Sequence, residues 1–425
     1  MRLDPIFSYR IREVPPLAAV RQKLRTDRID DPRADVRIKL TDSGFLNNVT
    51  SGKRIAVTAG SRGMGGFVPL LGGICDAIRT KGGVPFIIPA MGSHGGAKAD
   101  GQVEILKRLG VDEHEIGAEI RATMDTNDLG RSDTGAAAHL DVIAAEADGI
   151  IVLGRTKTHP ENREGIASGL LKMTTVGLGK QTGAQEAHTH KLWDSVRAVP
   201  KITLAKAPII CGVAVVENAF RQPAVIEVVP PTYEAFKEAD ERLLEVSKQY
   251  SADLPFEKLD LLIVDKLGKD ISGTGMDLNV IGNWRMNGGE PKPDFRRIVV
   301  LSLTKGSLGN GLGIGMADLT TQRFVDEFDW QTTYVNLFTA TEPDAMNTRE
   351  GQLPLALATD RDAIEAGLFS SLASQNPLIC RIKSTAELDE FWISEGLREE
   401  VERSDSLSLL TDFKPLPFDQ KGNLL

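Results

Sequence analysis

The fold of this chain is decided by residues 54–90, which read RIAVTAGSRGMGGFVPLLGGICDAIRTKGGVPFIIPA. The stretch begins with a short apolar run at 54–60, which predicts a buried strand. A glycine-rich turn follows at 61–67, and the apolar segment 67–83 then predicts a helix closed by glycines. A second apolar run at 84–90 completes a strand, helix and strand, which together predict two parallel strands.

The same order of strand, polar loop and helix continues outward along the chain. Residues 91–100 form a polar loop, and residues 101–110 predict a further helix. Two more apolar runs, DGIIVLGRTKTH at 148–159 and APIICGVAVVEN at 207–218, predict a third and a fourth strand. Because ligands bind beyond the carboxyl ends of strands in an open parallel sheet, we expect a site where the polar clusters follow these strands.

A second pattern of strands and helices follows a helix at 230–250 and a linker at 251–258. Its expected strands are 259–268, 296–304, 353–359 and 377–383, and its expected helices are 319–339, 361–372 and 386–403. The boundary is placed near residue 254. We therefore expect an α/β protein of two domains, 1–254 and 255–425, each with a mainly parallel sheet flanked by helices.

Composition excludes several classes of partner. The net charge is −9 and there is no dense block of Lys and Arg, so a nucleic-acid partner is not expected. No apolar run approaches the roughly 20 residues of a membrane-spanning helix, and no export signal is visible at the amino terminus. Cys75, Cys211 and Cys380 lie far apart, which suggests neither a disulfide framework nor a metal site. A cytoplasmic protein is expected.

Two histidines occupy polar segments after predicted strands. His94 lies between glycines in MGSHGG, where its imidazole is unshielded; the alternative is a turn histidine that caps the next helix. Arg155, Lys157 and His159 project to the same face of an extended chain and could converge on an anion. The alternative for these three residues is a strand end that simply becomes solvated.

Other candidates lie in the glycine-rich segments. Lys172 sits among small and apolar residues, which would lower the pKa of its amine and make it a nucleophile or covalent anchor, unless it only extends from a helix to solvent. His188 and His190 form an HxH pair whose side chains would share one side of a strand, a weak metal signal. Arg62 is a candidate carboxylate clamp, or else part of a surface ion pair. No GxGxxG spacing indicates a dinucleotide site.

In sequence order these motifs resemble the nickel-dependent lactate racemase family. They are AGSRG at 59–63, GSHGG at 92–96, KTHPENREGIASGLLK at 157–172 and AHTH at 187–190. The 16 positions from Lys172 to His188 match the spacing between the anchoring lysine and the nickel histidine of that family. The resemblance covers roughly residues 50 to 220.

The resemblance implies a role for each matching residue. His94 and His159 would be the paired acid and base, and Lys172 would hold a nickel pincer nucleotide (nickel pyridinium dithiodicarboxylate mononucleotide) covalently. His188 would bind the nickel and Arg62 the substrate carboxylate, with Lys157 available for further substrate contacts. The site would lie in a cleft between the domains, with the second domain closing over the cofactor, which upstream biosynthetic enzymes would supply.

The implied activity is racemisation or epimerisation of a 2-hydroxy acid, through hydride abstraction and return by way of a 2-keto acid. The acidic residue of the family's first motif is missing from AGSRG, and the segment between His159 and Lys172 is longer and more polar. Both departures favour a substrate larger than lactate, such as a sugar acid or a dicarboxylate. The alternatives are a dehydratase or lyase acting on a hydroxy acid, and a non-catalytic protein that binds the cofactor.

Overall fold

The computed structural model describes residues 13–61, 63–157, 168–340 and 347–425. The chain forms two compact units, each with its own sheet. The first, called here the central unit, consists of residues 25–251. The second, called the terminal unit, combines residues before 25 with residues from 252 onward. Both are α/β units with mainly parallel sheets flanked by helices, as predicted from the sequence.

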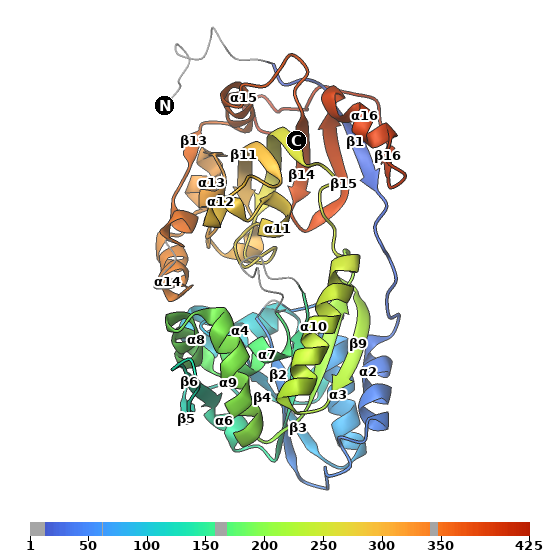
Figure 1. Ribbon diagram of the computed structural model, residues 1–425, viewed down its shortest axis with the longest axis vertical. Coiled ribbons are helices and arrows are strands. Elements are labelled where there is room, and N and C mark those ends of the chain that lie inside the picture. Colours follow the sequence, from blue (N-terminus) through green and yellow to red (C-terminus); the bar gives the residue numbers. More distant parts are fainter. Residues whose placement is uncertain (1–12, 62, 158–167, 341–346) are drawn as a thin grey trace. The chain divides into compact units, whose positions relative to one another are not determined.

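The central unit is built on a six-stranded sheet (Figure 1). Its strands, in spatial order, are β4 (Glu119–Ile120), β3 (Val84–Pro89), β2 (Arg54–Ala59), β7 (Gly149–Arg155), β8 (Ile209–Glu217) and β9 (Pro223–Val229). All neighbours are parallel except β8 and β9. A separate antiparallel pair joins β5 (Thr126–Arg131) and β6 (Ala137–Asp141). The four strands expected from the sequence are confirmed.

Helices cover both faces of this sheet because its strands alternate apolar side chains between the two faces. Val57 of β2 packs in a core with α2 (Pro32–Asp42) and α3 (Phe67–Thr80), whereas its neighbour Ala56 belongs to the opposite core. That opposite core includes residues of α9 (Leu192–Lys206) and α10 (Tyr233–Tyr250), which lie along the sheet in Figure 1. Other helices of the unit include α4 (Ala99–Arg108), α5 (Glu113–Ile116) and α6 (Val142–Ala145).

The segment that carries the expected cofactor residues is helical, with an interruption. It consists of α7 (Leu170–Lys172), a π-helical turn η2 (Met173–Gly177) and α8 (Lys180–Thr189). His188 therefore lies in the last turn of a helix and not on a strand. π-helical turns of this kind are frequent at functional sites.

The terminal unit is built on an eight-stranded sheet. Its strands, in spatial order, are β13 (Leu355–Leu357), β12 (Leu319–Thr321), β11 (Asp294–Leu303), β10 (Lys258–Leu267), β14 (Ile379–Ser384), β15 (Glu387–Ser394), β1 (Leu17–Gln22) and β16 (Leu407–Leu409). The first five are parallel, and the last three are added antiparallel. We expected residues 1–254 to form one domain; instead β1 pairs with β15 and β16, because its apolar side chains are buried in that sheet.

Two helices expected in this unit differ from the structure. The segment 319–339 begins with β12 and continues as α13 (Gln322–Glu327) and α14 (Trp330–Ala340). The segment 386–403 is mostly β15, followed by the short α16 (Arg398–Glu402). Leu388, Phe391 and Ile393 of β15 are buried in a core of the sheet, so tertiary packing overrides the helical pattern there. The helix expected at 361–372 is present as α15 (Asp360–Ser370).

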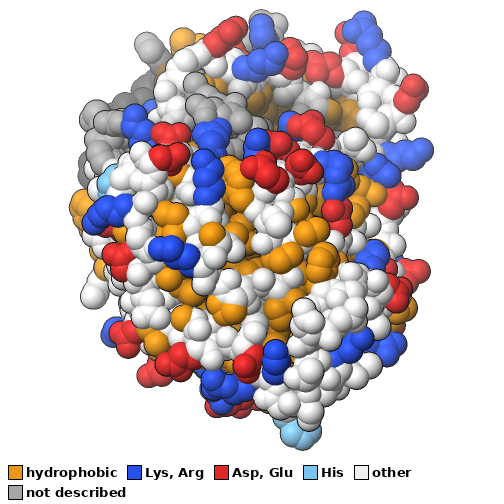
Figure 2. All heavy atoms as spheres, turned by 60° about the horizontal axis from the view of Figure 1, so that its bottom comes forward, with side chains coloured by type: hydrophobic (Ala, Val, Ile, Leu, Met, Phe, Trp, Pro, Cys, Tyr) orange, Lys and Arg blue, Asp and Glu red, His pale blue; other side chains and the backbone are white. Residues whose placement is uncertain are grey.

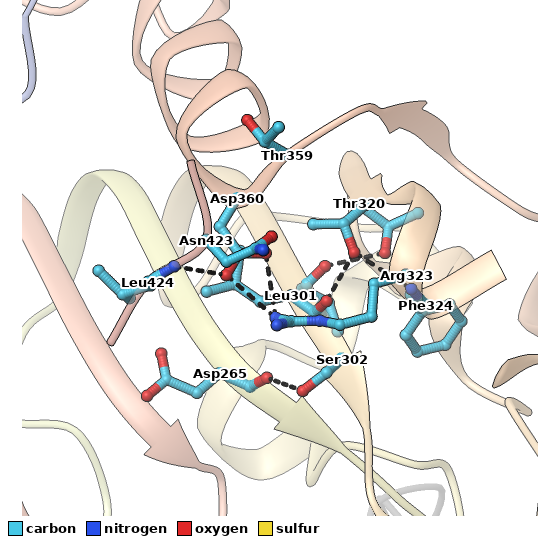
Figure 3. A network of polar contacts seen from close by, with 12 residues as sticks. Asp265, Leu301, Ser302, Thr320, Arg323, Phe324, Thr359, Asp360, Asn423 and Leu424 are labelled. Carbon is cyan, nitrogen blue, oxygen red and sulfur yellow. Dashed lines mark hydrogen bonds and ion pairs between the residues drawn. The ribbon is translucent and has the colours of Figure 1, made fainter. Parts of the chain in front are cut away.

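The last residues of the chain are tied to the terminal unit by a buried carboxylate (Figure 3). Asp360 accepts a hydrogen bond from the Leu424 backbone N–H at 2.9 Å. Both carboxylate oxygens also accept from Nη2 of Arg323, each at 3.0 Å. This network fixes the carboxyl-terminal segment beside the start of α15.

Charged side chains of both signs are intermixed with apolar ones on the face of the molecule drawn in Figure 2. Among the helices that the structure describes, none combines the length and the apolar character that crossing a membrane requires.

Candidate active site

A cavity of about 140 Å³ lies at the carboxyl edge of the parallel strands of the central unit. The strand order reverses between β2 and β7, because β3 and β4 follow on one side of β2 and β8 and β9 on the other. Such a switch point is where open α/β sheets bind ligands. The polar residues in the cavity wall are Ser61, His94, Arg155, Ser168 and Lys172, and its larger apolar side chains include Met64, Phe67, Met91 and Met173. Two expected site residues, His94 and Lys172, are thus brought together.

Arg155, at the end of β7, is held by a partly buried carboxylate. Its Nη1 atom lies 2.7 Å from Oε2 of Glu217, and the other oxygen of Glu217 accepts a hydrogen bond from the Gly65 backbone N–H. Burial opposes ionisation of Glu217, but the charge of Arg155 and the hydrogen bond from Gly65 outweigh it, so that the pKa of this carboxyl lies below its ordinary value. Glu217 therefore joins β7 to the glycine-rich loop after β2.

The glycine-rich loop passes very close to the chain after β8. A Cβ atom at Gly65 would lie only 1.5 Å from the backbone oxygen of Arg221. A side chain at this position would therefore displace backbone, which explains why the loop needs glycine here. The loop carries Arg62, which itself lies outside the described residues.

His94 occupies the loop that leads from β3 to α4. His94 is the N-cap residue of a short 3-10 turn, Gly95–Ala97, to which its side chain makes no capping hydrogen bond, whereas the N-cap of α4 is Lys98. A Cβ atom at Gly95 would approach the backbone of Gly101 to 2.5 Å, and Gly95 has a φ of 70°. The glycines after His94 therefore let the loop pack directly on the first turn of α4.

A buried polar network binds the backbone of the His94 loop. Gln102 donates from Nε2 to the carbonyl oxygens of Gly92 at 2.8 Å and of His94 at 3.3 Å. Its side-chain oxygen accepts from Nζ of Lys180 at 3.2 Å, and the same Nζ lies 2.9 Å from Oδ2 of Asp141. Lys180 and Asp141 are fully buried. Burial lowers the pKa of Lys180, and the charge of Asp141 opposes that shift.

Lys172 reaches the cavity from the end of α7. Its Nζ atom also lies 5.4 Å from the centre of the Trp193 ring, a distance typical of a cation–π contact. The structure places the half-buried Lys172 in the wall of the cavity, and both the anchor and the solvent-extending lysine stay predictions. The lowered pKa that the sequence suggests for its amine stays a prediction.

The two histidines of the HxH pair do not share one side of a strand. His188 is in the last turn of α8 and His190 follows the helix as its C-cap. Residues two apart on a helix point in different directions. Nδ1 of His190 lies 3.0 Å from the backbone oxygen of Glu186. His188 is not among the described residues that line the cavity.

The other two expected residues are His159 and Lys157. His159 lies outside the described residues. Lys157 exchanges two backbone hydrogen bonds with Ser168, at 3.1 and 3.0 Å, and Ser168 lines the cavity. Within the described ranges, no group of three or more His, Cys, Asp and Glu side chains is arranged to hold a metal ion.

Sequence reasoning missed the residues that support the site from outside the cavity wall, namely Glu217, Gln102 and Lys180. No signal in the sequence distinguishes Lys180 from a surface lysine.

No protein-family model matches this sequence, and no curated protein is similar enough in sequence to match it. Among solved structures, the chain is similar in fold to the lactate racemase apoprotein from Thermoanaerobacterium thermosaccharolyticum. The two chains are 14% identical with a TM-score of 0.46, and the alignment covers 69% of each.

Proposed function

We propose that this protein is an isomerase that racemises or epimerises a 2-hydroxy acid with the help of a nickel pincer nucleotide. The observation that carries the proposal is that His94 and Lys172, far apart in the sequence, line one cavity at the switch point of the sheet. The motif order and the spacing from Lys172 to His188 support the same reading.

The residues of the cavity suit the proposed cofactor in two respects. Lys172 offers an amine in the cavity wall, which is the group that a covalent anchor requires. Phe67, Met64 and Met173 provide apolar surface against which a flat ring can pack. His188 is the proposed nickel ligand. When bound, the cofactor would supply an acceptor and donor for the hydride of the substrate carbon.

The chain's own residues would handle the carboxylate and the protons. Arg62 would bind the substrate carboxylate through its planar guanidinium group, and Lys157 would contact other polar groups of the substrate. An imidazole nitrogen of His94 would take or return the hydroxyl proton, and His159 would do so for the opposite enantiomer. Arg155 is paired with Glu217, so we assign it a structural role at the cavity edge.

The substrate is proposed to be larger or more polar than lactate, such as a sugar acid or a dicarboxylate. The segment between His159 and Lys172 includes Glu161, Asn162 and Arg163, which could bind additional hydroxyl or carboxylate groups. The missing acidic residue in AGSRG supports the same substrate class.

The test uses protein from a host that builds the pincer cofactor. Nickel content and intact mass are measured for the wild type, Lys172→Ala and His188→Ala, with Lys107→Ala as a control because Lys107 is exposed on α4. We expect stoichiometric nickel and added mass in the wild type and the control. The added mass should be absent in Lys172→Ala, and the nickel should be lost from His188→Ala.

Activity is then screened with sugar acids and dicarboxylates in deuterated water. Hydride return keeps the original hydrogen at the inverted carbon, whereas a dehydratase or lyase that removes a proton would exchange it. Absence of nickel and added mass in the wild type, from a host proven competent with a known racemase, would refute the cofactor assignment. Cofactor binding without turnover of any substrate would indicate a binding protein instead.

A further inference from the structure

A buried carboxylate on α10 contacts the short helix that carries Lys172. Asp240 is 1% exposed. Its Oδ1 atom accepts a hydrogen bond from the Leu170 backbone N–H, and its Oδ2 atom accepts one from Leu171, both at 2.9 Å. These are the first two residues of α7, whose N–H groups have no partner within the helix. One side chain thus satisfies both donors, immediately before Lys172.

The glycine before α7 is what allows this contact. A Cβ atom at Gly169 would lie 2.1 Å from Oδ1 of Asp240, well inside any permitted contact. The carboxylate therefore occupies the space that a side chain at residue 169 would need. Gly169 also lines the cavity beside Lys172, so the contact lies at the site itself.

Two threonines hold the carbonyl side of the same turn. Oγ1 of Thr174 and Oγ1 of Thr175 each donate to the Leu171 backbone oxygen at 2.9 Å. Both threonines are buried and belong to the π-helical turn η2 that follows Lys172. The turn is thereby fixed by side chains at its N–H groups and at its carbonyl groups.

Burial alone would disfavour a carboxylate at position 240. Burial raises the pKa of its carboxyl to about 7, although the hydrogen bonds from Leu171 and Leu170 oppose the shift. Burying a carboxylate is costly unless its oxygen atoms are well satisfied. A buried apolar residue on α10 would avoid that cost but would leave the two N–H groups of α7 without acceptors.

We propose that Asp240 is a positioning residue for Lys172, fixing the turn from which this lysine enters the cavity. The proposal rests on the proposed function in one respect, which is that Lys172 is the residue whose position matters for cofactor attachment. Asp240 itself does not line the cavity among the described residues, so it acts through the backbone of α7.

The test compares Asp240→Asn with the wild type, both without cofactor. Asparagine keeps the volume of aspartate but places an N–H₂ donor against one of the two backbone donors. We expect amide hydrogen exchange at Leu170 and Leu171 to become at least about tenfold faster, because their acceptors are disturbed. The rate at which a small amine-specific reagent modifies Lys172, measured by site-resolved mass spectrometry, should change at least about threefold relative to the exposed Lys107.

A matched control is Ser247→Ala on the same helix. Ser247 is buried and its Oγ donates to the Leu244 backbone oxygen at 2.9 Å, so this variant loses a buried hydrogen bond without touching α7. We expect the control to leave exchange at Leu170 and the modification of Lys172 unchanged. A general loss of stability would alter both variants alike, whereas loss of positioning alters only Asp240→Asn.

A second pair of variants tests the same contact independently of whether Asp240→Asn folds normally. Gly169→Ala should show the signature of Asp240→Asn because its methyl group would push the carboxylate away. In an Asp240→Ala background the obstructing oxygen is gone, so Gly169→Ala should have little further effect on exchange. Equal effects of Gly169→Ala in both backgrounds would refute the contact as the cause.

The proposal is overturned if Asp240→Asn leaves both exchange at Leu170 and Leu171 and modification of Lys172 within twofold of the wild type. It is also overturned if those values change only together with the whole central unit. Because these measurements use protein without cofactor, they do not depend on nickel loading. Cofactor occupancy of the wild type bears on the proposed function alone, so failure of one can be told from failure of the other.

Discussion

Two carboxylates of the central unit, the partly buried Glu217 and the buried Asp240, are stabilised by different partners. Glu217 faces the guanidinium group of Arg155, whose charge brings the pKa of the carboxyl below its ordinary value despite burial. Asp240 is matched to two backbone N–H groups, and burial raises its pKa to about 7. A neighbouring full charge thus outweighs the increase in carboxyl pKa that burial causes, whereas two backbone N–H dipoles do not.

Asp240 should make stability depend on pH in a defined direction. Its pKa of about 7 exceeds the ordinary value of 3.8, so between these values the folded protein binds more protons than the unfolded chain. The free energy of unfolding therefore falls as pH rises through this range, by up to about 1.4 kcal/mol per pH unit. Asp240→Asn lacks this contribution, so its stability deficit relative to wild type should shrink from about pH 5 to about pH 8.

Urea denaturation of both proteins at the two pH values measures the deficit. Ser247→Ala is again the control, because it removes a buried hydrogen bond without removing a titrating group. A deficit of Asp240→Asn that is the same at both pH values would contradict the raised pKa.

At the scale of elements, the loop with His94 depends on a contact between helices far apart in the sequence. Gln102 on α4 binds the backbone of the loop, and Lys180 at the start of α8 binds Gln102 and Asp141. Asp141 also caps α6 by accepting from the Ala144 backbone N–H at 3.0 Å. The buried ion pair of Lys180 and Asp141 therefore connects α8 to the start of α6, and the hydrogen bond from Lys180 to Gln102 extends this network to α4.

Removing one partner of this ion pair should lower the free energy of unfolding. Lys180→Met removes the cation and leaves the carboxylate of Asp141 buried without its partner, so we expect the free energy of unfolding to fall by about 3 to 5 kcal/mol. Adding Asp141→Leu should restore part of the loss because the uncompensated charge disappears, although the cap of α6, worth about 1 kcal/mol, is lost as well. Denaturant unfolding of the single and double variants gives both values. A single variant as stable as wild type would show that the pair contributes no net stability.

Local patterns predicted the elements whose packing is local. The strand and helix at 54–80 follow from their apolar spacing, and the glycines around His94 indicated a loop exposed to a ligand. The strand β15 was mistaken for a helix because its inward side chains are set by pairing with β14 and β1, which lie elsewhere in the sequence. The burial of Lys180 could not be predicted for the same reason, since its partner Asp141 comes from another element.

At the scale of the whole molecule, the terminal unit is assembled from both ends of the chain. β1 lies between β15 and β16, and Ala18 and Val20 of this strand are fully buried. The expected boundary near residue 254 lies close to the start of the second part of this unit, at Ala252. Sequence reasoning did not find the role of β1, because the pairing of a single short strand leaves no periodic signal. The expected position of the site between two domains stays a prediction.

Removing residues 1–24 should therefore damage the unit that is distant in sequence. We expect this deletion to make residues 252–425 sensitive to limited proteolysis, because an interior strand of their sheet is missing, while residues 25–251 keep the resistance of the full chain. Mass spectrometry of the protease-resistant fragments identifies which unit survives. Equal resistance of both units in the deletion variant would show that β1 contributes little to the sheet.

The position of β1 also orders the events of biosynthesis. Along the chain this strand precedes residues 25–251, whereas its partner β15 spans Glu387–Ser394 and is translated after them. Residues 25–251 can fold during translation, as domains commonly do. Until β15 has been made, the apolar residues of β1 lack the partner strand beside which they are buried in the sheet. A chaperone that recognises nascent apolar segments would thus have time to bind β1, and any delay in translating Glu387–Ser394 would prolong that exposure.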